Sequence, residues 1–417
     1  MNDTSDTTRQ SGYAATSAAA VNTQSSYTVS AWAYLTENTE YRAVLSQTGT
    51  DHSGFVLYYS AGVKRWVYRF NWSDSSGTRH YVTKNASAEG PALKVWTHVA
   101  AVYDADEKTI QLYVNGRAQG EPVAVPAGGE KQTPDGTLQF GRASNVYGSY
   151  TQYWRGRIDE VAVFQEALTP AEVAKEARLL DSTDTATATE LVAFWNPEGA
   201  SGTSLTDAVT GYGRSLALTG GASLDGEAIV LDGTDDAATT AGPVVDDTGS
   251  FTVTTEVELD QAGLNAKGTG FIGQVLGQRT ADGSAWGLWY ETTGTETRFD
   301  DEDNPYEVPV GFWRFGRLGA DGTFTAVDSD SVAVVGSRVR LTGVYDAQAG
   351  TIALYLDSTQ NDTDTPYTAA LGSGELAVGR SFVNGSWGHH LPGRISDIQI
   401  WVGAAADGTQ VDTLVGG

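Results

Sequence analysis

The sequence predicts an all-β chain of two antiparallel sandwiches in tandem, joined by a short linker. Runs of β-branched and aromatic residues recur along the chain, and clusters of Gly, Asp, Asn and Ser separate them. The dipeptides Asn115-Gly116 and Asp135-Gly136 suit the tight turns of β-hairpins. One set of strand motifs reappears later in the chain in the same order. These observations predict one sandwich fold that occurs twice.

The first half of the chain shows the strand pattern most clearly. A helix is predicted after these strands, because Thr169 supplies an N-cap hydroxyl, Pro170 fits the first helical position and Glu172 completes a capping box. The polar run 181–187 then reads as a linker. The predicted strands of the first half are Tyr27–Leu35, Arg42–Gln47, Gly54–Tyr59, Lys64–Trp72, Trp96–Tyr103, Thr109–Asn115, Thr137–Arg142 and Arg157–Gln165.

An internal repeat defines the expected domains. Four motifs of the first copy recur in the second with short changes in loop length, so we predict one domain over residues 12–180 and another over 188–405. The pairs of motifs are Ser26–Val29 with Ser250–Val253, Val102–Asp104 with Val344–Asp346, Phe140–Arg142 with Val378–Arg380, and Gly156–Ile158 with Gly393–Ile395.

Charge and composition exclude several classes of function. Residues 1–180 hold 18 acidic and 16 basic residues, whereas residues 181–417 hold 34 acidic and 10 basic ones. An electronegative second half repels phosphates, so we expect no nucleic-acid partner and no anionic membrane partner. The chain has no cysteine, which excludes thiolate catalysis and disulfides. No apolar run approaches the roughly 18 residues that span a bilayer, so membrane insertion is not expected.

The repeated motifs resemble a known family. The run from Trp96-Thr97-His98-Val99 to Asn115-Gly116, followed by Gly156-Arg157-Ile158, looks like a laminin G-like, concanavalin A-like jelly roll of the kind found in secreted actinobacterial proteins. The resemblance implies two jelly-roll sandwiches that serve in carbohydrate binding or adhesion. It also implies an extracellular segment of a larger protein, with the signal peptide outside this chain and with neighbouring domains as partners.

Catalysis is not expected, although glycoside hydrolases share this architecture. Such enzymes need two carboxylates about 5.5 Å apart, and those of this fold use a Glu-x-Asp-x-x-Glu strand, which the chain lacks. The nearest substitutes are Glu256 and Glu258 on one strand and the acidic run 300–303 in a loop. Acids spaced in this way more commonly lie on a solvent-exposed strand face or in a solvent-exposed loop. We therefore predict no catalytic residue.

Calcium is the only cofactor that the resemblance suggests, because the family often pairs a last-strand aspartate with oxygens of the opening strand. In the first copy Asp159 matches the last-strand position, but the opening strand is missing. In the second copy Asp232 matches the opening strand, whereas Ser396 takes the aspartate position and Asp397 lies next to it. We predict Asp159, Asp232 and Asp397 as metal ligands. The alternative is that Asp159 only accepts backbone hydrogen bonds.

Sugar binding requires exposed aromatic faces beside hydrogen-bonding groups. Two loops that follow the repeated Gly-Arg motif, 145–154 and 384–390, hold such residues in a Gly, Ser and Asn context. The end of the strand Lys64–Trp72 is a third candidate. The alternative is that these rings pack over the edge of the sandwich. The predicted carbohydrate-binding residues are Trp72, Tyr147, Tyr150, Tyr153, Trp154, Asn384, Trp387 and His389.

The sequence thus predicts a non-catalytic binding or adhesion segment that recognises a glycan or cell-surface polysaccharide. The alternative is a structural spacer or assembly module without a small ligand, and a glycoside hydrolase is the third possibility.

The first copy also has fewer residues before its first shared strand than the second copy has. The second copy holds Glu190–Trp195 and Glu227–Asp232 in this region, which read as opening strands. In the first copy only Gly12–Thr16 resembles the end of this region. We therefore expect the first sandwich to lack its opening strands, and another chain, an upstream segment or the second domain to complete it.

Overall fold

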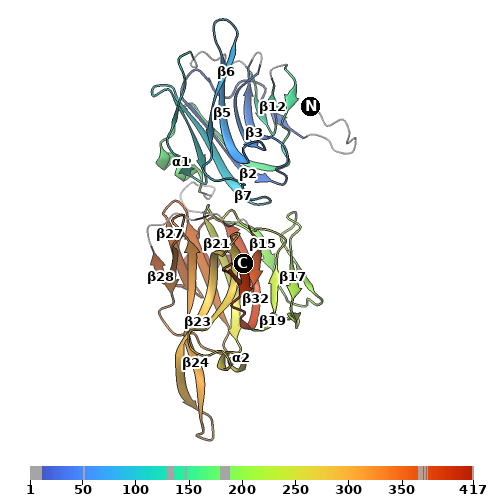
Figure 1. The fold of residues 1–417 in the computed structure, drawn as a ribbon, viewed down its shortest axis with the longest axis vertical. Helices are drawn as coiled ribbons and strands as arrows, with labels where there is room; N and C mark the ends of the chain where they lie inside the picture. Colours follow the sequence, from blue (N-terminus) through green and yellow to red (C-terminus); the bar gives the residue numbers. More distant parts are fainter. Residues whose placement is uncertain are drawn as a thin grey trace. The chain divides into compact units, whose positions relative to one another are not determined.

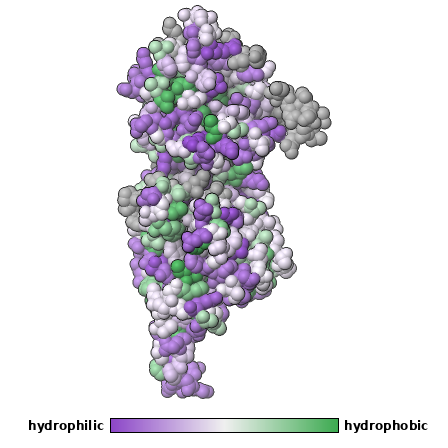
Figure 2. Space-filling view, in the orientation of Figure 1, coloured by the Kyte–Doolittle hydropathy of each residue, from purple (hydrophilic) through white to green (hydrophobic). Residues whose placement is uncertain are grey.

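A computed structural model describes residues 12–49, 52–128, 136–145, 148–178, 188–364, 370, 372 and 374–415. The chain divides between Ala177 and Arg178 into two compact units, which we call the first and the second unit. Both are built from antiparallel sheets (Figure 1), as the sequence predicts. The face drawn in Figure 2 is mostly hydrophilic, with hydrophobic residues in small, separate groups.

The described residues of the first unit form two large sheets and a small two-stranded one. One sheet has the order β1 (Ala14–Ala15), β11 (Leu138–Phe140), β3 (Arg42–Thr48), β4 (Ser53–Ser60), β5 (Arg65–Ser73) and β6 (Arg79–Asn85). The other has the order β10 (Val123–Ala124), β8 (Thr109–Val114), β7 (Trp96–Asp104), β2 (Tyr27–Leu35) and β14 (Gly156–Phe164), with β9 (Arg117–Ala118) also paired to β8. The small sheet pairs β12 (Ala143–Ser144) with β13 (Tyr150–Thr151).

Aromatic rings from both large sheets form the core of the first unit. Tyr27 of β2 lies 5.3 Å from Phe55 of β4, and Phe70 of β5 lies 4.5 Å from Tyr103 of β7, between ring centroids. The Tyr27 hydroxyl also makes a 2.7 Å hydrogen bond with the Tyr68 hydroxyl. Rings of this size supply a large share of the hydrophobic stabilisation of a two-sheet core.

The second unit repeats this plan with additional strands. One sheet has the order β18 (Ser223–Leu224), β19 (Ile229–Asp232), β32 (Pro392–Val402), β21 (Phe251–Leu259), β26 (Val339–Asp346), β27 (Thr351–Leu356) and β28 (Thr359–Asp364), and β15 (Glu190–Trp195) also pairs with β32. The other has the order β16 (Ser204–Thr206), β17 (Ser215–Thr219), β20 (Ala237–Thr239), β29 (Leu376–Val378), β22 (Ile272–Arg279), β23 (Ser284–Phe299), β24 (Pro305–Leu318) and β25 (Phe324–Asp328). A small sheet pairs β30 (Ser381–Val383) with β31 (Ser386–Gly388).

The repeat seen in the sequence holds in the core. Phe251 of β21 lies 5.9 Å from Tyr345 of β26, as Tyr27 lies 5.6 Å from Tyr103 in the first unit. The last strands of both units carry a bulge at the same place, where Glu160 and Asp397 adopt φ angles of 44° and 48°. A positive φ in a non-glycine residue is uncommon, so this shared feature marks the strands as equivalent.

The described residues include three short helices outside the sheets: α1 (Pro170–Glu176), α2 (Gln261–Asn265) and α3 (Gly408–Val415). The predicted capping box of α1 is present, because the Thr169 side chain accepts from Glu172 N and the Glu172 carboxylate accepts from Thr169 N. Within the described part of the chain, no helix has the length and apolar character needed to cross a bilayer.

The second unit buries one aspartate whose ionisation makes its stability depend on pH. The Asp247 carboxylate accepts hydrogen bonds from Gly372 N at 2.8 Å and Gln278 Nε2 at 3.2 Å. Burial raises the pKa of Asp247 from 3.8 to about 7, although the nearby Arg317 guanidinium acts in the opposite direction. Between these two pKa values the folded state binds a proton that the unfolded state has lost.

We therefore expect the free energy of unfolding of the second unit to fall as the pH rises from about 4 through about 7. Asp247→Asn, which carries no titrating group, removes this part of the dependence. Denaturant unfolding of both proteins across this pH range measures the difference. Equal pH dependence in the two proteins would show that Asp247 does not titrate in this way.

Candidate functional site

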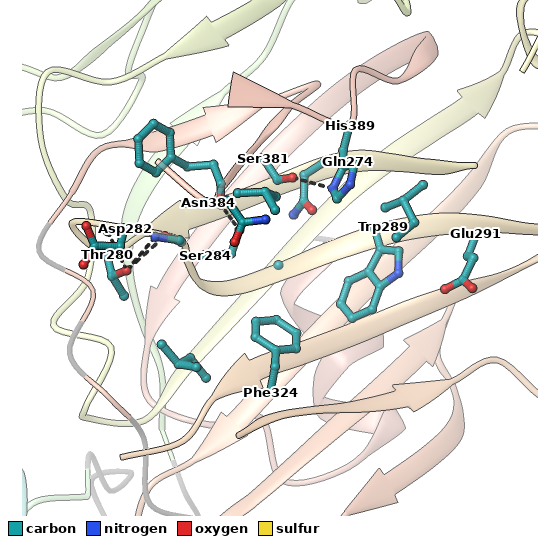
Figure 3. Close-up of a pocket in the computed structure, with 16 residues that line it drawn as sticks. Gln274, Thr280, Asp282, Ser284, Trp289, Glu291, Phe324, Ser381, Asn384 and His389 are labelled. Carbon is teal, nitrogen blue, oxygen red and sulfur yellow. Dashed lines mark hydrogen bonds between the residues drawn. The ribbon is translucent and has the colours of Figure 1, made fainter. Parts of the chain in front are cut away.

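A groove of about 530 Å³ lies on the sheet of the second unit that contains β22, β23 and β25 (Figure 3). Its floor comes from alternate residues of β22 and β23, and its walls come from the β22–β23 turn, from β25 and from the segment 381–389. Figure 3 shows Thr280, Asp282 and Asn384 at one end and Trp289 with Glu291 at the other. The groove is thus mainly an open sheet surface with two different ends.

An aromatic pair forms the apolar part of the groove. Trp289 of β23 and Phe324 of β25 have ring centroids 5.9 Å apart with an edge-to-face tilt of 61°. Phe324 is 43% exposed, whereas Trp289 is 9% exposed, so Phe324 offers the more open face. Gly316 of β24 allows this packing, because a Cβ at this position would approach both rings to less than 3 Å.

Hydrogen-bonding groups form the polar end. The turn between β22 and β23 is closed by Thr280 N, which donates to Gly283 O at 2.7 Å, and by Gly283 N, which donates to Thr280 Oγ1 at 3.0 Å. This turn presents the exposed carboxylate of Asp282. Gly385 N donates to Asp282 O at 3.0 Å and so holds Asn384 beside the turn. An amide and a carboxylate side chain therefore both line this end of the groove.

His389 lies between the two ends. Its Nδ1 is 2.9 Å from Ser381 Oγ, and its backbone oxygen accepts from Gln274 N at 2.9 Å. Burial, followed by the proximity of His390, lowers the pKa of His389, so its imidazole is neutral near pH 7. A neutral imidazole can donate or accept a hydrogen bond, which suits a hydroxyl ligand.

An ion-pair chain neutralises the acid at the aromatic end. Arg314 Nη1 lies 3.3 Å from Glu291 Oε2, and Arg314 Nε lies 3.3 Å from Asp328 Oδ1. Glu291 therefore faces a cation as well as the groove. Its carboxylate can accept hydrogen bonds from a neutral ligand while the arginine balances its charge.

The loop predicted in the second copy contributes to this groove in part. Asn384 and His389 line it. Trp387 does not: its ring lies 5.0 Å from the Phe382 ring, and the Arg380 guanidinium sits 4.1 Å from its centroid. Phe382 itself lines the groove, so Trp387 supports the wall.

Among the described residues, those predicted in the first copy do not form one aromatic rim. Trp72 is 5% exposed and belongs to the core cluster, so it presents no open ring face. Tyr150 lies under the Arg142 guanidinium, 3.5 Å from its carbon to the ring centroid, and Tyr153 is half-buried. Tyr147 lies outside the described residues.

Trp154 is the fifth residue predicted in the first copy. Its ring stacks on Trp66 at 6.1 Å and packs against the core. This position gives the ring a packing role, and a sugar contact for Trp154 stays a prediction.

A smaller cavity of about 170 Å³ lies in the first unit. Asn145 and Gln152 of the predicted loop line it, together with Tyr58, Asn71 and Tyr81. The Arg69 guanidinium covers the Tyr81 ring at 4.1 Å. This cavity has about a third of the volume of the groove and a more polar lining.

In the second unit the predicted metal ligands Asp232 and Asp397 do not come together. Asp232 lies with Asp235 and Asp236, and one oxygen from each falls within 4.8 Å of the others. Asp232 pairs with Pro392 in the sheet, so Asp397 lies five residues further along β32, about 16 Å away at roughly 3.3 Å per residue.

Other partners also occupy these acids. Asp397 forms a 2.6 Å ion pair with Arg340, and Asp159 Oδ1 accepts from Glu160 N at 2.9 Å. The carboxylates of Asp232 and Asp236 each accept backbone hydrogen bonds within their turn. The donor set near Asp232 is hard oxygen, as calcium prefers, and calcium binding stays a prediction.

Two of the acids considered as catalytic candidates, Glu256 and Asp300, form ion pairs or turn hydrogen bonds. Glu256 pairs with Arg340 at 2.8 Å and with Arg338 at 3.5 Å. Asp300 stabilises the tip of the β23–β24 hairpin, because its Oδ1 accepts from Glu302 N and Asn304 N at 2.9 Å each. The sequence interpretation placed this acidic run in a loop, and the structure shows a tight hairpin turn between two long strands.

Trp289, Phe324 and Glu291 were not predicted from the sequence. Trp289 and Glu291 lie two residues apart on β23, so they face the same side, which a period-2 reading of 284–291 indicates. Phe324 follows the turn-forming pair Asp321-Gly322, and nothing in its own segment places it opposite Trp289. That proximity depends on the pairing of β24 with both β23 and β25.

A family model identifies the chain. The model of the concanavalin A-like lectin/glucanases superfamily, laminin G type, matches residues 7–174 and 232–408. These matches span most of the sequence, so the chain belongs to this superfamily. A search of curated proteins finds no match.

Solved structures with similar folds include three from bacterial proteins. The receptor-binding domain of botulinum neurotoxin type G is 11% identical with a TM-score of 0.37, covering 54% of this chain and 51% of that one. This chain therefore spans about half of that domain. The CBM40 of Ruminococcus gnavus IT-sialidase, bound to α2,6-sialyllactose, is 18% identical with a TM-score of 0.30. The match covers 36% of this chain and 82% of that one.

Domain 4 of the extracellular arabinanase AbnA from Geobacillus stearothermophilus, in complex with arabinotriose, is 17% identical with a TM-score of 0.33, covering 54% of this chain and 98% of that one.

Proposed function

We propose that the chain is a non-catalytic glycan-binding protein and that the groove on the second unit is its main binding site. The observation that supports this most is the Trp289–Phe324 pair, which lies in the same groove as amide, carboxylate and imidazole groups. A pyranose ring has an apolar face of C–H groups surrounded by hydroxyls. The aromatic pair can pack against the apolar face of the sugar, and the polar groups can hydrogen-bond its hydroxyls.

The arrangement of charges favours recognition over hydrolysis. Glycoside hydrolysis uses two carboxylates on either side of one bond, at about 5 to 9.5 Å. In the groove, Asp282 and Glu291 lie at opposite ends (Figure 3). Glu291 also pairs with Arg314. The acids therefore act as hydrogen-bond acceptors for hydroxyls. We place this function outside the cell, on a polysaccharide or glycoprotein surface, with other domains as neighbours.

Phe324→Ala provides the test of the site. Because Phe324 is 43% exposed, its removal costs little stability, but it takes away the open ring face. Loss of a central aromatic contact commonly costs about 2 kcal/mol of binding, which is roughly thirtyfold in Kd. We therefore expect the full chain to bind specific members of a glycan array and Phe324→Ala to lose most of this signal.

Phe299→Ala is the matched control, because Phe299 is 63% exposed and lies at the far end of the β23–β24 hairpin. It should bind as the unmodified chain does. A blank array for the unmodified chain would support the spacer function instead. Equal binding by Phe324→Ala and the unmodified chain would move the site away from the groove.

A further inference from the structure

The cavity of the first unit occupies the same place in the fold as the groove of the second unit. Ala43 of β3 pairs with Tyr58 of β4, and its N–H donates to Gln152 O at 2.8 Å. The matching residue of β22 pairs with Trp289 of β23, and its N–H donates to His389 O at 2.9 Å. Tyr58 and Gln152 are therefore the counterparts of Trp289 and His389, and all four line their sites.

The second ring of the groove also has a counterpart in the cavity. Arg69 of β5 and Gly316 of β24 are equivalent, because each lies opposite the residue two places before the aromatic residue just named. Two positions further along these strands, the neighbouring strand supplies Tyr81 in the first unit and Phe324 in the second. Both sites thus have aromatic residues at the same two positions.

The cavity differs from the groove by an arginine at one of these equivalent positions. Gly316 leaves the space in which the two rings of the groove meet. In the cavity the guanidinium carbon of Arg69 lies 4.1 Å from the centroid of the Tyr81 ring, and Arg69 Nε donates to Asn71 Oδ1 at 2.7 Å. A cation therefore stands where the groove has no side chain.

The described lining of the cavity is basic. Arg79 also lines it and is exposed, and His80 beside it pairs with Asp74 at 2.9 Å. Among the described residues, no carboxylate lies within ion-pair distance of Arg69 or Arg79. Two arginines are thus available to an anionic ligand, and a guanidinium binds a carboxylate through charge-assisted hydrogen bonds.

A buried acceptor adds a second requirement for a ligand. Gln152 Oε1 is buried and accepts no hydrogen bond from the described residues. A buried acceptor without a donor is costly, and a ligand hydroxyl in the cavity would satisfy it. The cavity therefore suits a ligand that carries hydroxyls as well as a negative charge.

Charge separates the two sites. The described residues that line the groove include Asp282 and Glu291 and no arginine or lysine, whereas those that line the cavity include two arginines and no acid. The charges of the two halves differ in the same direction, since residues 1–180 are nearly balanced and residues 181–417 are strongly acidic. An anionic sugar is thus disfavoured in the groove and favoured in the cavity.

We propose that the cavity of the first unit binds a sugar that carries a carboxylate, so that the two units bind sugars of different charge. Arg69 and Arg79 bind the carboxylate, the exposed Tyr81 ring packs against C–H groups, and Gln152 Oε1 accepts from a hydroxyl. The volume of about 170 Å³ suits a single terminal sugar unit. This site goes beyond the proposed function, because it lies in the other unit and takes another class of ligand.

The test uses the full chain and an array of neutral, carboxylated and sulfated saccharides. We expect carboxylated members to give a weaker signal than the ligands of the groove, because the cavity is smaller, and Phe324→Ala to keep this signal. Arg69→Met should raise the Kd of the best carboxylated saccharide about tenfold or more by calorimetry, because the carboxylate loses a charged donor. Binding of neutral saccharides should not change.

Arg65→Met is the matched control. Arg65 lies on the same strand, pairs with Glu89 at 2.9 Å and is absent from the described lining of the cavity, so its loss should leave the affinity unchanged. Arg79→Met is a second variant at an exposed position, where the fold is little affected, and should weaken binding several-fold. Thermal unfolding verifies that each variant is folded.

Several results would overturn the proposal: no carboxylated saccharide binds, sulfated saccharides bind equally well, or the variants of Arg69 and Arg79 behave as Arg65→Met does. Loss of carboxylated ligands in Phe324→Ala would place them in the groove and also contradict it. Carboxylated ligands that depend on Arg69, on an array without neutral ligands, would contradict the proposed function of the groove and support the cavity.

Discussion

Trp195→Ala should lower the free energy of unfolding of the second unit by about 3 to 5 kcal/mol. Trp195 is 0% exposed and lies at the end of β15, opposite Ile398 of β32. Its removal leaves a cavity that the rigid sheet cannot fill, and the lost contacts add to the lost transfer free energy. Calorimetric or denaturant unfolding of the full chain measures the effect on the second unit.

Trp387→Ala is the control for this change. Trp387 is half-buried and packs on Phe382 at the edge of the groove, so its loss should cost much less. A loss of stability below about 1 kcal/mol for Trp195→Ala would show that β15 is not an integral part of the second sandwich.

Arg317→Met should destabilise the second unit more at pH 8 than at pH 5. Arg317 is 0% exposed, and its guanidinium lies 4.2 Å from the Tyr345 ring and 5.2 Å from the Phe251 ring, measured to their centroids. It lowers the pKa of the buried Asp247 carboxylate. Without it the buried Asp247 carboxyl takes up a proton instead of staying ionised, so at pH 8, one pH unit above the pKa of about 7, the lost charge pairing costs about 1.4 kcal/mol in addition to the lost packing of the guanidinium.

At pH 5 the Asp247 carboxyl is protonated in the variant, and the penalty is small. The double variant Asp247→Asn/Arg317→Met should recover most of the stability at pH 8, because neither charge is then buried. Denaturant unfolding at both pH values checks the three proteins. An equal loss at pH 5 and pH 8 would assign the role of Arg317 to packing instead of charge.

Much of the fold was predictable because its signals are local. Strand β2 begins and ends where the sequence predicts, and the Thr169 capping box starts α1. The repeat located equivalent strands in both halves without any structure. The long hairpin of β23 and β24 was not predicted, and its outer half, which is rich in Thr and Glu, buries few side chains.

The candidate site was predictable only in part, for a physical reason. Asn384 and His389 lie in a loop rich in Gly and Ser, unlike a core segment, so the sequence analysis could predict them as binding residues. Trp289 and Phe324 lie on separate strands, and their proximity comes from sheet pairing that the sequence does not encode locally. The buried residues Asp247 and Arg317 were not predicted for a different reason. Charged residues are rarely fully buried, so a sequence pattern assigns them to the surface.

The most direct test of glycan binding in the groove is hydrogen exchange of the full chain with and without the glycan that gives the strongest array signal. We expect added protection in 272–274, 284–291 and 381–389, which line the groove, and none in Phe324→Ala at the same glycan concentration. Protection confined to 52–58, 69–81 and 143–152 would place the site in the first unit and contradict the account.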